Sequence, residues 1–182
     1  TDIQLGDVEA SDVLGYAIKL VASVTKLDKG KILPCVMPTL VSYDNIISGV
    51  NDVCNAVLVY GDGIDQTIFY GRGAGKLPTA SAVLGDVIEE LKTEEIGTDR
   101  AQTWEDCNND EIVADYRESS ARMYFRVSAG CTLVPEGAEI IENGSELAFV
   151  TKTMTFAEAE KLEASIKAAG GEVKSRIAVL DI

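Results

Sequence analysis

The sequence has 182 residues, of which 46% are apolar and 25% charged, so the chain can bury a core of its own and does not have the composition of a disordered protein. Lys and Arg number 16 against 30 Asp and Glu, a formal charge of −14, which argues against nucleic acid or an anionic membrane surface as a partner. No apolar run approaches the roughly 18 residues that a membrane span requires.

Histidine is absent from the sequence. Its absence removes the commonest general base, the usual zinc ligand and every serine or cysteine nucleophile that depends on histidine. The cysteines are far apart and show no metal-ligand spacing, so we expect reduced thiols and no bound metal. Residue 1 is not followed by a charged-then-apolar leader, so we expect a cytoplasmic protein. The cysteines are Cys35, Cys54, Cys107 and Cys131.

The excess of negative charge is concentrated in one segment. Between Asp86 and Glu118, twelve acidic residues stand against only Lys92, Arg100 and Arg117. Runs of like charge are usually solvated, so we interpret this segment as an acidic face or connector.

The first quarter of the chain predicts a short helix and two strands. Residues 6–12 are typical of a turn or a short helix, and residues 16–24 alternate with one fully apolar face, as a strand does. Residues 31–38 predict a second strand. Because Pro34 and Pro38 cannot donate to a strand ladder, we expect this strand to lie at an edge of its sheet.

A β-hairpin and a long helix are predicted next. Residues 53–60 and 66–70 have strand composition and enclose the turn sequence Gly61-Asp62-Gly63. Pro78 then opens an amphipathic helix, because apolar residues recur with the period of one helix face. These apolar residues are Ala80, Val83, Leu84, Val87, Ile88 and Leu91.

The periodicity is lost between residues 94 and 118, which predicts a linker. A second unit follows, with strands at 123–127 and 147–151 and a last strand at 173–180. Between the last two strands, Thr155 and Glu158 form a capping-box pattern at the start of a helix that Gly170-Gly171 ends.

The predicted fold class is α+β. We expect a mixed or antiparallel sheet with helices on one face, followed by a small ferredoxin-like α/β unit. The corresponding domains are residues 1–118 and residues 119–182.

The order of strand, glycine-rich loop and helix in residues 66–92 is the part of the sequence most typical of a binding site. N–H groups at a helix N-terminus attract anions, and glycines admit a ligand close to the backbone. Neither known phosphate-binding motif is complete: a P-loop needs glycine in place of Tyr70, and the dinucleotide fingerprint needs glycine in place of Lys76. A purely structural tight turn therefore stays open.

The same loop and helix resemble a known family. Residues 69–83, FYGRGAGKLPTASAV, with Asp86 after them, are similar to the signature of homoserine dehydrogenases. Residues 14–20, 37–40 and 55–62 are similar to flanking segments of that family, in the same order. The resemblance covers residues 3–92.

This resemblance implies NAD(P)-dependent interconversion of L-aspartate 4-semialdehyde and L-homoserine, a step of threonine and methionine biosynthesis. In the family, the Rossmann domain, the substrate-binding acids and the proton-transfer lysine all precede the position that matches Thr1. The chain thus resembles the C-terminal portion of such an enzyme. No catalytic residue is expected in it, no cofactor is expected to be tightly bound, and the chain alone should be inactive. Lys19 lies in a later strand motif and is interpreted as a surface lysine.

The resemblance places one active-site element inside this chain, the glycine loop. Gly73, Ala74 and Gly75 would let the cofactor approach the backbone, and Thr79 lies where the helix opens beside it. Arg72 and Lys76 would face the same region, where they could hold an anion or remain solvated.

Residues 121–182 resemble a regulatory ACT domain. Residues 128–135 depart from it, because they replace the Asp-x-x-Gly turn and first helix near which ACT domains bind effector amino acids. We therefore expect a degenerate, structural ACT-like unit.

Two functions stay open at this point: part of a homoserine dehydrogenase, or a non-catalytic dimerisation and regulatory module. A free-standing protein that binds a ligand through the glycine loop is a third alternative. We expect a homodimer through the sheet of residues 16–70, because unpaired strand edges invite pairing. Homoserine or aspartate semialdehyde would be the substrate of the full-length enzyme, and neither nucleic acid nor membrane is expected as a partner.

Overall fold

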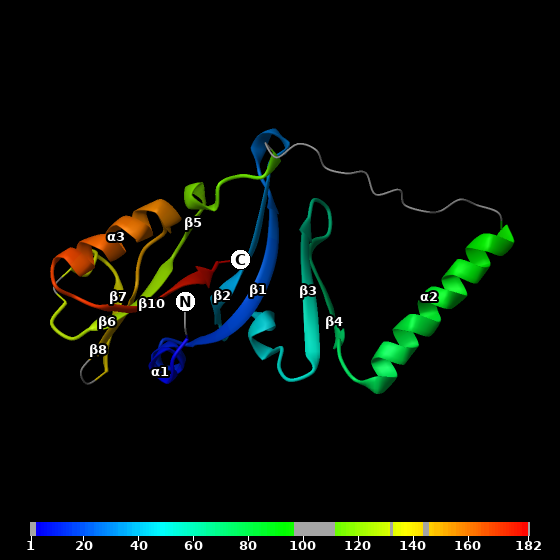
Figure 1. Ribbon diagram of the computed structural model, residues 1–182, viewed down its shortest axis with the longest axis horizontal. Coiled ribbons are helices and arrows are strands. Elements are labelled where there is room, and N and C mark those ends of the chain that lie inside the picture. The colour runs from blue at the N-terminus through cyan, green and yellow to red at the C-terminus, as the bar shows by residue number, and fades with distance from the viewer. Residues whose placement is uncertain (1–2, 97–111, 132, 144–145, 182) are drawn as a thin grey trace. The chain divides into compact units, whose positions relative to one another are not determined.

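The structure is a computed structural model that describes residues 3–96, 112–131, 133–143 and 146–181 (Figure 1). The chain divides into two compact units, one formed by Thr1–Ser48 with Asn109–Ile182 and the other by Gly49–Asn108. The linker predicted for residues 94–118 falls largely outside the described residues. The domain boundary predicted after Glu118 separates two segments of different sequence character, whereas the compact units are defined by packing. This boundary stays a prediction.

The first unit contains a six-stranded mixed sheet with strand order β1-β2-β10-β6-β8-β7. β2 and β10 run parallel, and the other neighbours are antiparallel. Its helices and strands are α1 (Leu5–Val13), β1 (Tyr16–Lys26), β2 (Ile32–Ser42), β5 (Ser120–Ala121), β6 (Met123–Ser128), β7 (Glu139–Asn143), β8 (Glu146–Val150), β9 (Met154–Thr155), α3 (Phe156–Ala168) and β10 (Val173–Leu180).

The sheet carries a helix on each face. Ala10 of α1 belongs to the same apolar cluster as Tyr124, whereas Ile166 of α3 belongs to the cluster that contains Phe125. Adjacent residues of a strand point to opposite faces, so Tyr124 and Phe125 assign α1 and α3 to opposite sides of β6. The expected α+β class with a mixed sheet is confirmed, but the expectation of helices on one face is wrong for this sheet.

The predicted edge position of the second strand is also wrong. β1 is the end strand, and β2 pairs with β1 along its whole length and with β10 over Thr39–Val41. The two prolines still limit the pairing, since the ladder with β10 begins immediately after Pro38. A proline without an N–H group cannot extend such a ladder.

A buried ionic cluster connects α1 to the sheet. Asp7 accepts hydrogen bonds from Arg126 Nε at 2.7 Å, from the Gln4 backbone N–H at 2.8 Å and from the Ser175 hydroxyl. Arg126 also donates to Glu146 at 2.6 Å. Burial alone raises the pKa of Asp7, but the hydrogen bonds from Arg126, Ser175 and Gln4 outweigh it and hold this pKa below its usual range.

The capping box predicted at residue 155 is confirmed. The Thr155 hydroxyl accepts from the Glu158 backbone N–H at 3.1 Å, and the Glu158 carboxylate accepts from the Thr155 backbone N–H at 2.8 Å. These two hydrogen bonds satisfy two donors at the start of α3. Gly170 follows the helix with a φ of 85°, a left-handed conformation typical of a helix end.

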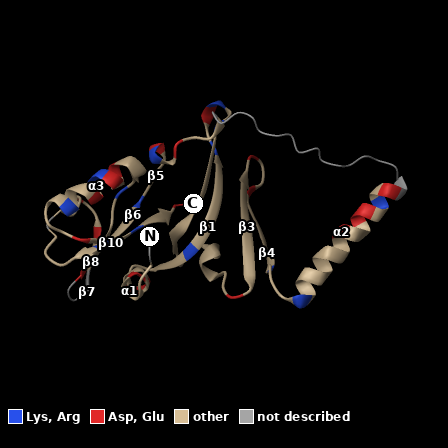
Figure 2. Ribbon diagram, viewed as in Figure 1, with Lys and Arg blue, Asp and Glu red and all other residues tan. Residues whose placement is uncertain are grey.

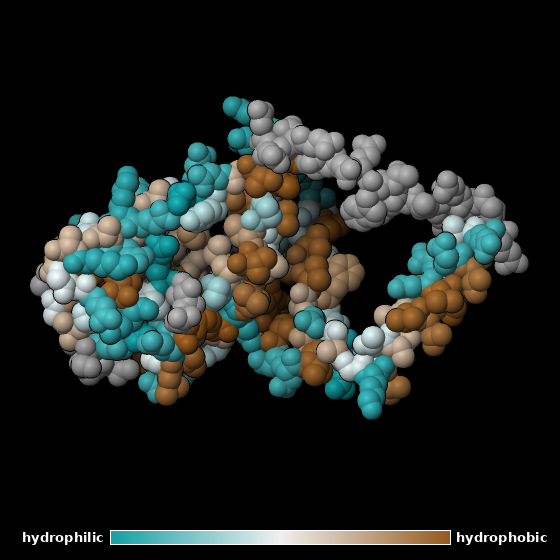
Figure 3. Space-filling view, in the orientation of Figure 1, coloured by the Kyte–Doolittle hydropathy of each residue, from teal (hydrophilic) through white to brown (hydrophobic). Residues whose placement is uncertain are grey.

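The second unit is a hairpin followed by a long helix, as predicted. β3 (Cys54–Gly61) and β4 (Asp65–Arg72) are antiparallel, and α2 (Lys76–Ile96) follows them. The apolar side of α2 is exposed, with 83% of Leu77 and 62% of Leu84 accessible to solvent, and Figure 3 shows its apolar side chains along one side of the helix. Its acidic residues lie toward its C-terminal end (Figure 2).

Among the described residues there is no helix with the length and apolar character needed to span a bilayer.

Candidate functional site

The candidate site is the loop that joins β4 to α2. β4 ends at Arg72 and α2 begins at Lys76, so the loop consists of the three residues Gly73, Ala74 and Gly75. The Gly73 backbone N–H donates to the Val53 carbonyl at 3.0 Å. This hydrogen bond continues the hairpin by one residue beyond β4 and fixes the point at which the loop leaves the hairpin.

The absence of a side chain matters at Gly73 and at Gly75 for different physical reasons. A Cβ atom at Gly73 would lie 1.8 Å from Asn55 Nδ2, so a larger residue would displace the Asn55 side chain. Gly75 has a φ of 117°, which side chains of L residues rarely adopt. The two glycines therefore allow a turn of three residues from a strand into a helix.

The start of α2 presents its backbone to solvent. Thr79 N–H donates to the Gly75 carbonyl at 3.1 Å, while Lys76 and Leu77 precede it in the first turn. All three loop residues and Thr79 are exposed. None of the ion pairs formed among the described residues involves Arg72 or Lys76, so both cations lie next to the loop without a carboxylate partner at contact distance. The structure thus brings the six predicted residues together, as their adjacency in sequence requires. They are Arg72, Gly73, Ala74, Gly75, Lys76 and Thr79.

The titratable side chains nearest the loop in sequence are those of Tyr70, Arg72 and Lys76. The hydrogen bond with Cys54 raises the pKa of Tyr70 above its usual range, so the phenol stays protonated at neutral pH. Lys19 lies within β1 opposite Thr39, half-buried in the other unit. The described residues also contain no group of three or more metal-ligating side chains.

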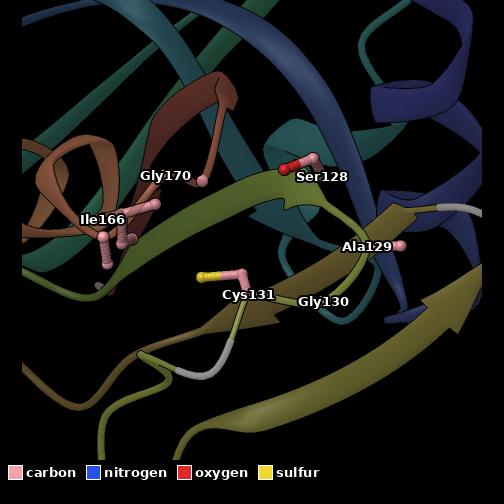
Figure 4. A pocket seen from close by; sticks show the side chains of 8 residues that line it. Ser128, Ala129, Gly130, Cys131, Ile166 and Gly170 are labelled. Carbon is pink, nitrogen blue, oxygen red and sulfur yellow. The ribbon is translucent and has the colours of Figure 1, made fainter.

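A second candidate lies where the sequence departs from an ACT domain. Ser128, Gly130 and Cys131 line a cavity of about 80 Å³ together with Ile166 and Gly170. Figure 4 shows these residues coming from the end of β6 and the connection after it, and from α3 and the turn that follows it. The described residues that line this cavity include no charged side chain, so they do not supply the groups that would recognise the carboxylate and ammonium of an amino acid.

Comparison with known proteins finds relatives of the first part of the chain. The family model described as homoserine dehydrogenase matches residues 1–88. A homoserine dehydrogenase of Lactococcus lactis is 41% identical over 96 residues, which are 53% of this chain and 22% of that protein. One from Synechocystis is 47% identical over 85 residues, 45% of this chain and 20% of that protein. Residues 1–88 are thus related to homoserine dehydrogenases, and the resemblance found in the sequence is confirmed.

Solved structures extend the similarity to almost the whole chain. A homoserine dehydrogenase from Thiobacillus denitrificans matches with a TM-score of 0.75 and 25% identity, over 97% of this chain and 45% of that one. The S. aureus homoserine dehydrogenase at pH 7.0 matches with a TM-score of 0.69 and 25% identity, over 99% of this chain and 46% of that one. The chain therefore spans less than half of the solved proteins that it resembles.

Proposed function

We propose that this chain is the C-terminal part of a homoserine dehydrogenase. The complete enzyme would interconvert L-aspartate 4-semialdehyde and L-homoserine by hydride transfer with NAD(P), in threonine and methionine biosynthesis in the cytoplasm. The relationship of residues 1–88 to this family carries the proposal, because the glycine loop lies within that segment. This chain alone would be inactive, because the resemblance places the Rossmann domain and the proton-transfer lysine outside it.

The role proposed for the loop is close backbone approach. Gly73, Ala74 and Gly75 are exposed and carry little side-chain bulk, and Thr79 adds a hydroxyl in the first turns of α2. Arg72 and Lys76 would attract an anionic group to the same place. An open loop of this kind does not enclose a dinucleotide. We therefore assign no step of hydride transfer to residues of this chain, and the grip on NAD(P) would come from outside it.

A chimeric enzyme tests the proposal. Residues 1–88 of this chain would replace the matching segment of the Lactococcus lactis homoserine dehydrogenase, which is 41% identical to this chain over 96 residues. We expect homoserine-dependent reduction of NAD or NADP by the chimera and none by this chain alone. Turnover by the isolated chain, or a folded chimera without turnover, would contradict the proposal.

Two glycine variants of the chimera test the loop itself. Gly75→Ala forces a residue with a Cβ into a φ of 117°, so kcat/KM should fall about tenfold or more as the loop shifts. Gly85→Ala is the matched control, because nothing lies within 4 Å of a Cβ at this position of α2. Its activity should stay within about twofold. Equal losses in both variants would show that the loop has no special role.

The second candidate function is a non-catalytic homodimerisation and regulatory module. The strand pair β1–β2 supports it, because large apolar residues are exposed on one of its faces. The exposed fractions are 76% for Leu20, 71% for Val24 and 71% for Val36. A neighbouring copy could cover this apolar face within the segment 16–70. In sedimentation experiments we expect a dimer that Leu20→Glu dissociates, whereas Ser23→Glu, on the opposite face of β1, leaves it intact. A monomeric parent chain would contradict this function.

The ACT-like unit also remains a proposal. Its support is the strand order β10-β6-β8-β7 with antiparallel neighbours and with α3 between β8 and β10, an arrangement compatible with a ferredoxin-like unit. The described residues between β6 and β7 contain no helix. Together with the uncharged cavity beside Cys131, this supports a structural rather than an effector-binding role.

A further inference from the structure

A second cavity lies on the α3 side of the large sheet, where β2 and β10 diverge. The two strands pair only from Thr39 and Ala178 onward, so the residues before them are separated. The resulting cavity has a volume of about 160 Å³. It is lined by Met37, Pro38, Tyr116, Met123, Phe156, Arg176 and Ala178.

The walls of this cavity are apolar and aromatic except for one cation. Tyr116 and Phe156 meet edge to face, with ring centroids 5.7 Å apart. Met123 is only 1% exposed, so the sheet side of the cavity is shielded from bulk solvent. Arg176 is the single charged lining residue, and a guanidinium is the side chain best suited to recognise a carboxylate.

Arg176 has unused capacity to donate hydrogen bonds. Its Nη1 atom is buried and makes no hydrogen bond with the described residues, although it lies 3.3 Å from Glu163 Oε2. Glu163 is shared, because its other oxygen accepts from Lys167 Nζ at 2.6 Å. Buried polar groups normally form hydrogen bonds, so Arg176 Nη1 is available to donate to a further acceptor.

Arg176 belongs to a network of ion pairs beside the cavity. Its other cations are Lys167 and Arg117, and its carboxylates are Glu163, Glu160 and Asp115. The network is balanced in charge, and Arg176 is its member that lines the cavity. An anion in the cavity could accept from Arg176 Nη1 without breaking any of these ion pairs.

We propose that this cavity binds a small monocarboxylate with an apolar or aromatic body, held by Arg176 and packed against Tyr116, Phe156 and the two methionines. The site lies in the unit that does not contain the glycine loop. It is independent of the proposed dehydrogenase function, and its test requires no nicotinamide.

Methyl NMR of the whole chain tests this site with benzoate as the probe. The chain has three methionines, of which Met37 and Met123 line the cavity and Met154 does not. Benzoate up to about 20 mM should shift the methyl signals of Met37 and Met123 and leave Met154 as an internal reference. Benzamide, which has the same shape without the charge, should bind at least about tenfold more weakly.

Variants separate specific binding from adventitious contact. Arg176→Met keeps the apolar stem and should weaken benzoate binding about tenfold or more, and Arg176→Lys should restore part of the affinity. Lys174→Met removes a charge from the same strand away from the cavity and should leave binding within about twofold. An unchanged Met154 signal verifies that each variant is folded. Absence of a benzoate shift, equal binding of benzamide, or equal affinity in Arg176→Met would overturn the proposal.

Discussion

Asp7 shows how one buried charge holds two distant parts of the chain together. It is fully buried, and its main partner Arg126 lies 119 residues later in the sequence. Burying either charge alone would be costly, and the pair is tolerated because hydrogen bonds from Gln4 and Ser175 complete the shell of Asp7. Nothing in the local pattern of α1 or β6 predicts this partnership, since an isolated Asp in an acidic helix is normally solvated.

The first prediction concerns the loss of this charge. Asp7→Asn should lower the free energy of unfolding by about 3 kcal/mol, because Arg126 remains buried with less compensation. Urea denaturation at neutral pH measures the change. Glu172→Gln is the control: its ion pair with Lys174 is at the surface, with 67% of the glutamate side chain exposed, and its removal should cost less than about 0.5 kcal/mol. Similar losses in both variants would show that the cluster is not a stabilising centre.

The second prediction concerns pH. The pKa of Asp7 is lower in the folded chain than in the unfolded one, where it is about 3.9. Its contribution is therefore complete above that unfolded value and is lost as the pH falls through the folded value. The stability difference between the parent chain and Asp7→Asn should shrink as the pH falls from about 5 to about 2. Denaturation at several pH values measures this, and a difference independent of pH would contradict it.

At the scale of elements, local signals predicted most helices and strands. Alternation predicted β1, β6 and β8, glycine chemistry predicted the β3–β4 turn, and the capping box predicted the start of α3. β7 was not predicted, because Glu139–Asn143 does not alternate between polar and apolar residues. The edge position of β2 was mispredicted for a different reason: the strand that covers its far side, β10, is 131 positions or more away, and no local signal indicates it.

The third prediction belongs to α3. Thr155→Ala removes the hydroxyl that accepts from the Glu158 backbone and should cost about 1 kcal/mol of stability. Chemical denaturation again measures it. Ser165→Ala on the same helix is the control, since the Ser165 hydroxyl bonds only to the carbonyl of Lys161, within the helix; it should be neutral within about 0.5 kcal/mol. A neutral Thr155→Ala would mean that α3 is held by packing alone.

At the scale of the whole molecule, the large sheet joins strands of residues 1–88, the part related to homoserine dehydrogenases, to strands of residues 123–180. Leu40 and Val41 of β2 are fully buried, and they lie in register with Val179 and Leu180 of β10. Most strands of both segments could be predicted from their own sequence, but their joining into one sheet could not, because a parallel pairing over this separation depends on the finished core. The glycine loop, by contrast, could be located fully from sequence, since all its residues are adjacent.

The fourth prediction follows from this fusion. A chain that ends at Glu118 loses β6, β8 and β10 and should show no cooperative thermal unfolding, because the partners of Leu40 and of Asp7 are removed. In the control, a Gly-Ser linker replaces residues 49–108, which form the other compact unit. This control should keep a cooperative transition. Circular dichroism on heating measures both, and a cooperative transition in the chain that ends at Glu118 would contradict the prediction.

The central position of β10 also has a consequence during synthesis. The strand order places β10 between β2 and β6, so the ribosome completes five strands of the sheet before the one that joins them. Until residues 173–180 emerge from the exit tunnel, β2 and β6 cannot be bridged, and their apolar faces are exposed in the nascent chain. Chaperones that bind extended apolar segments should therefore hold the chain until β10 is made, and messages truncated before the codon for Val173 should yield products that proteases remove.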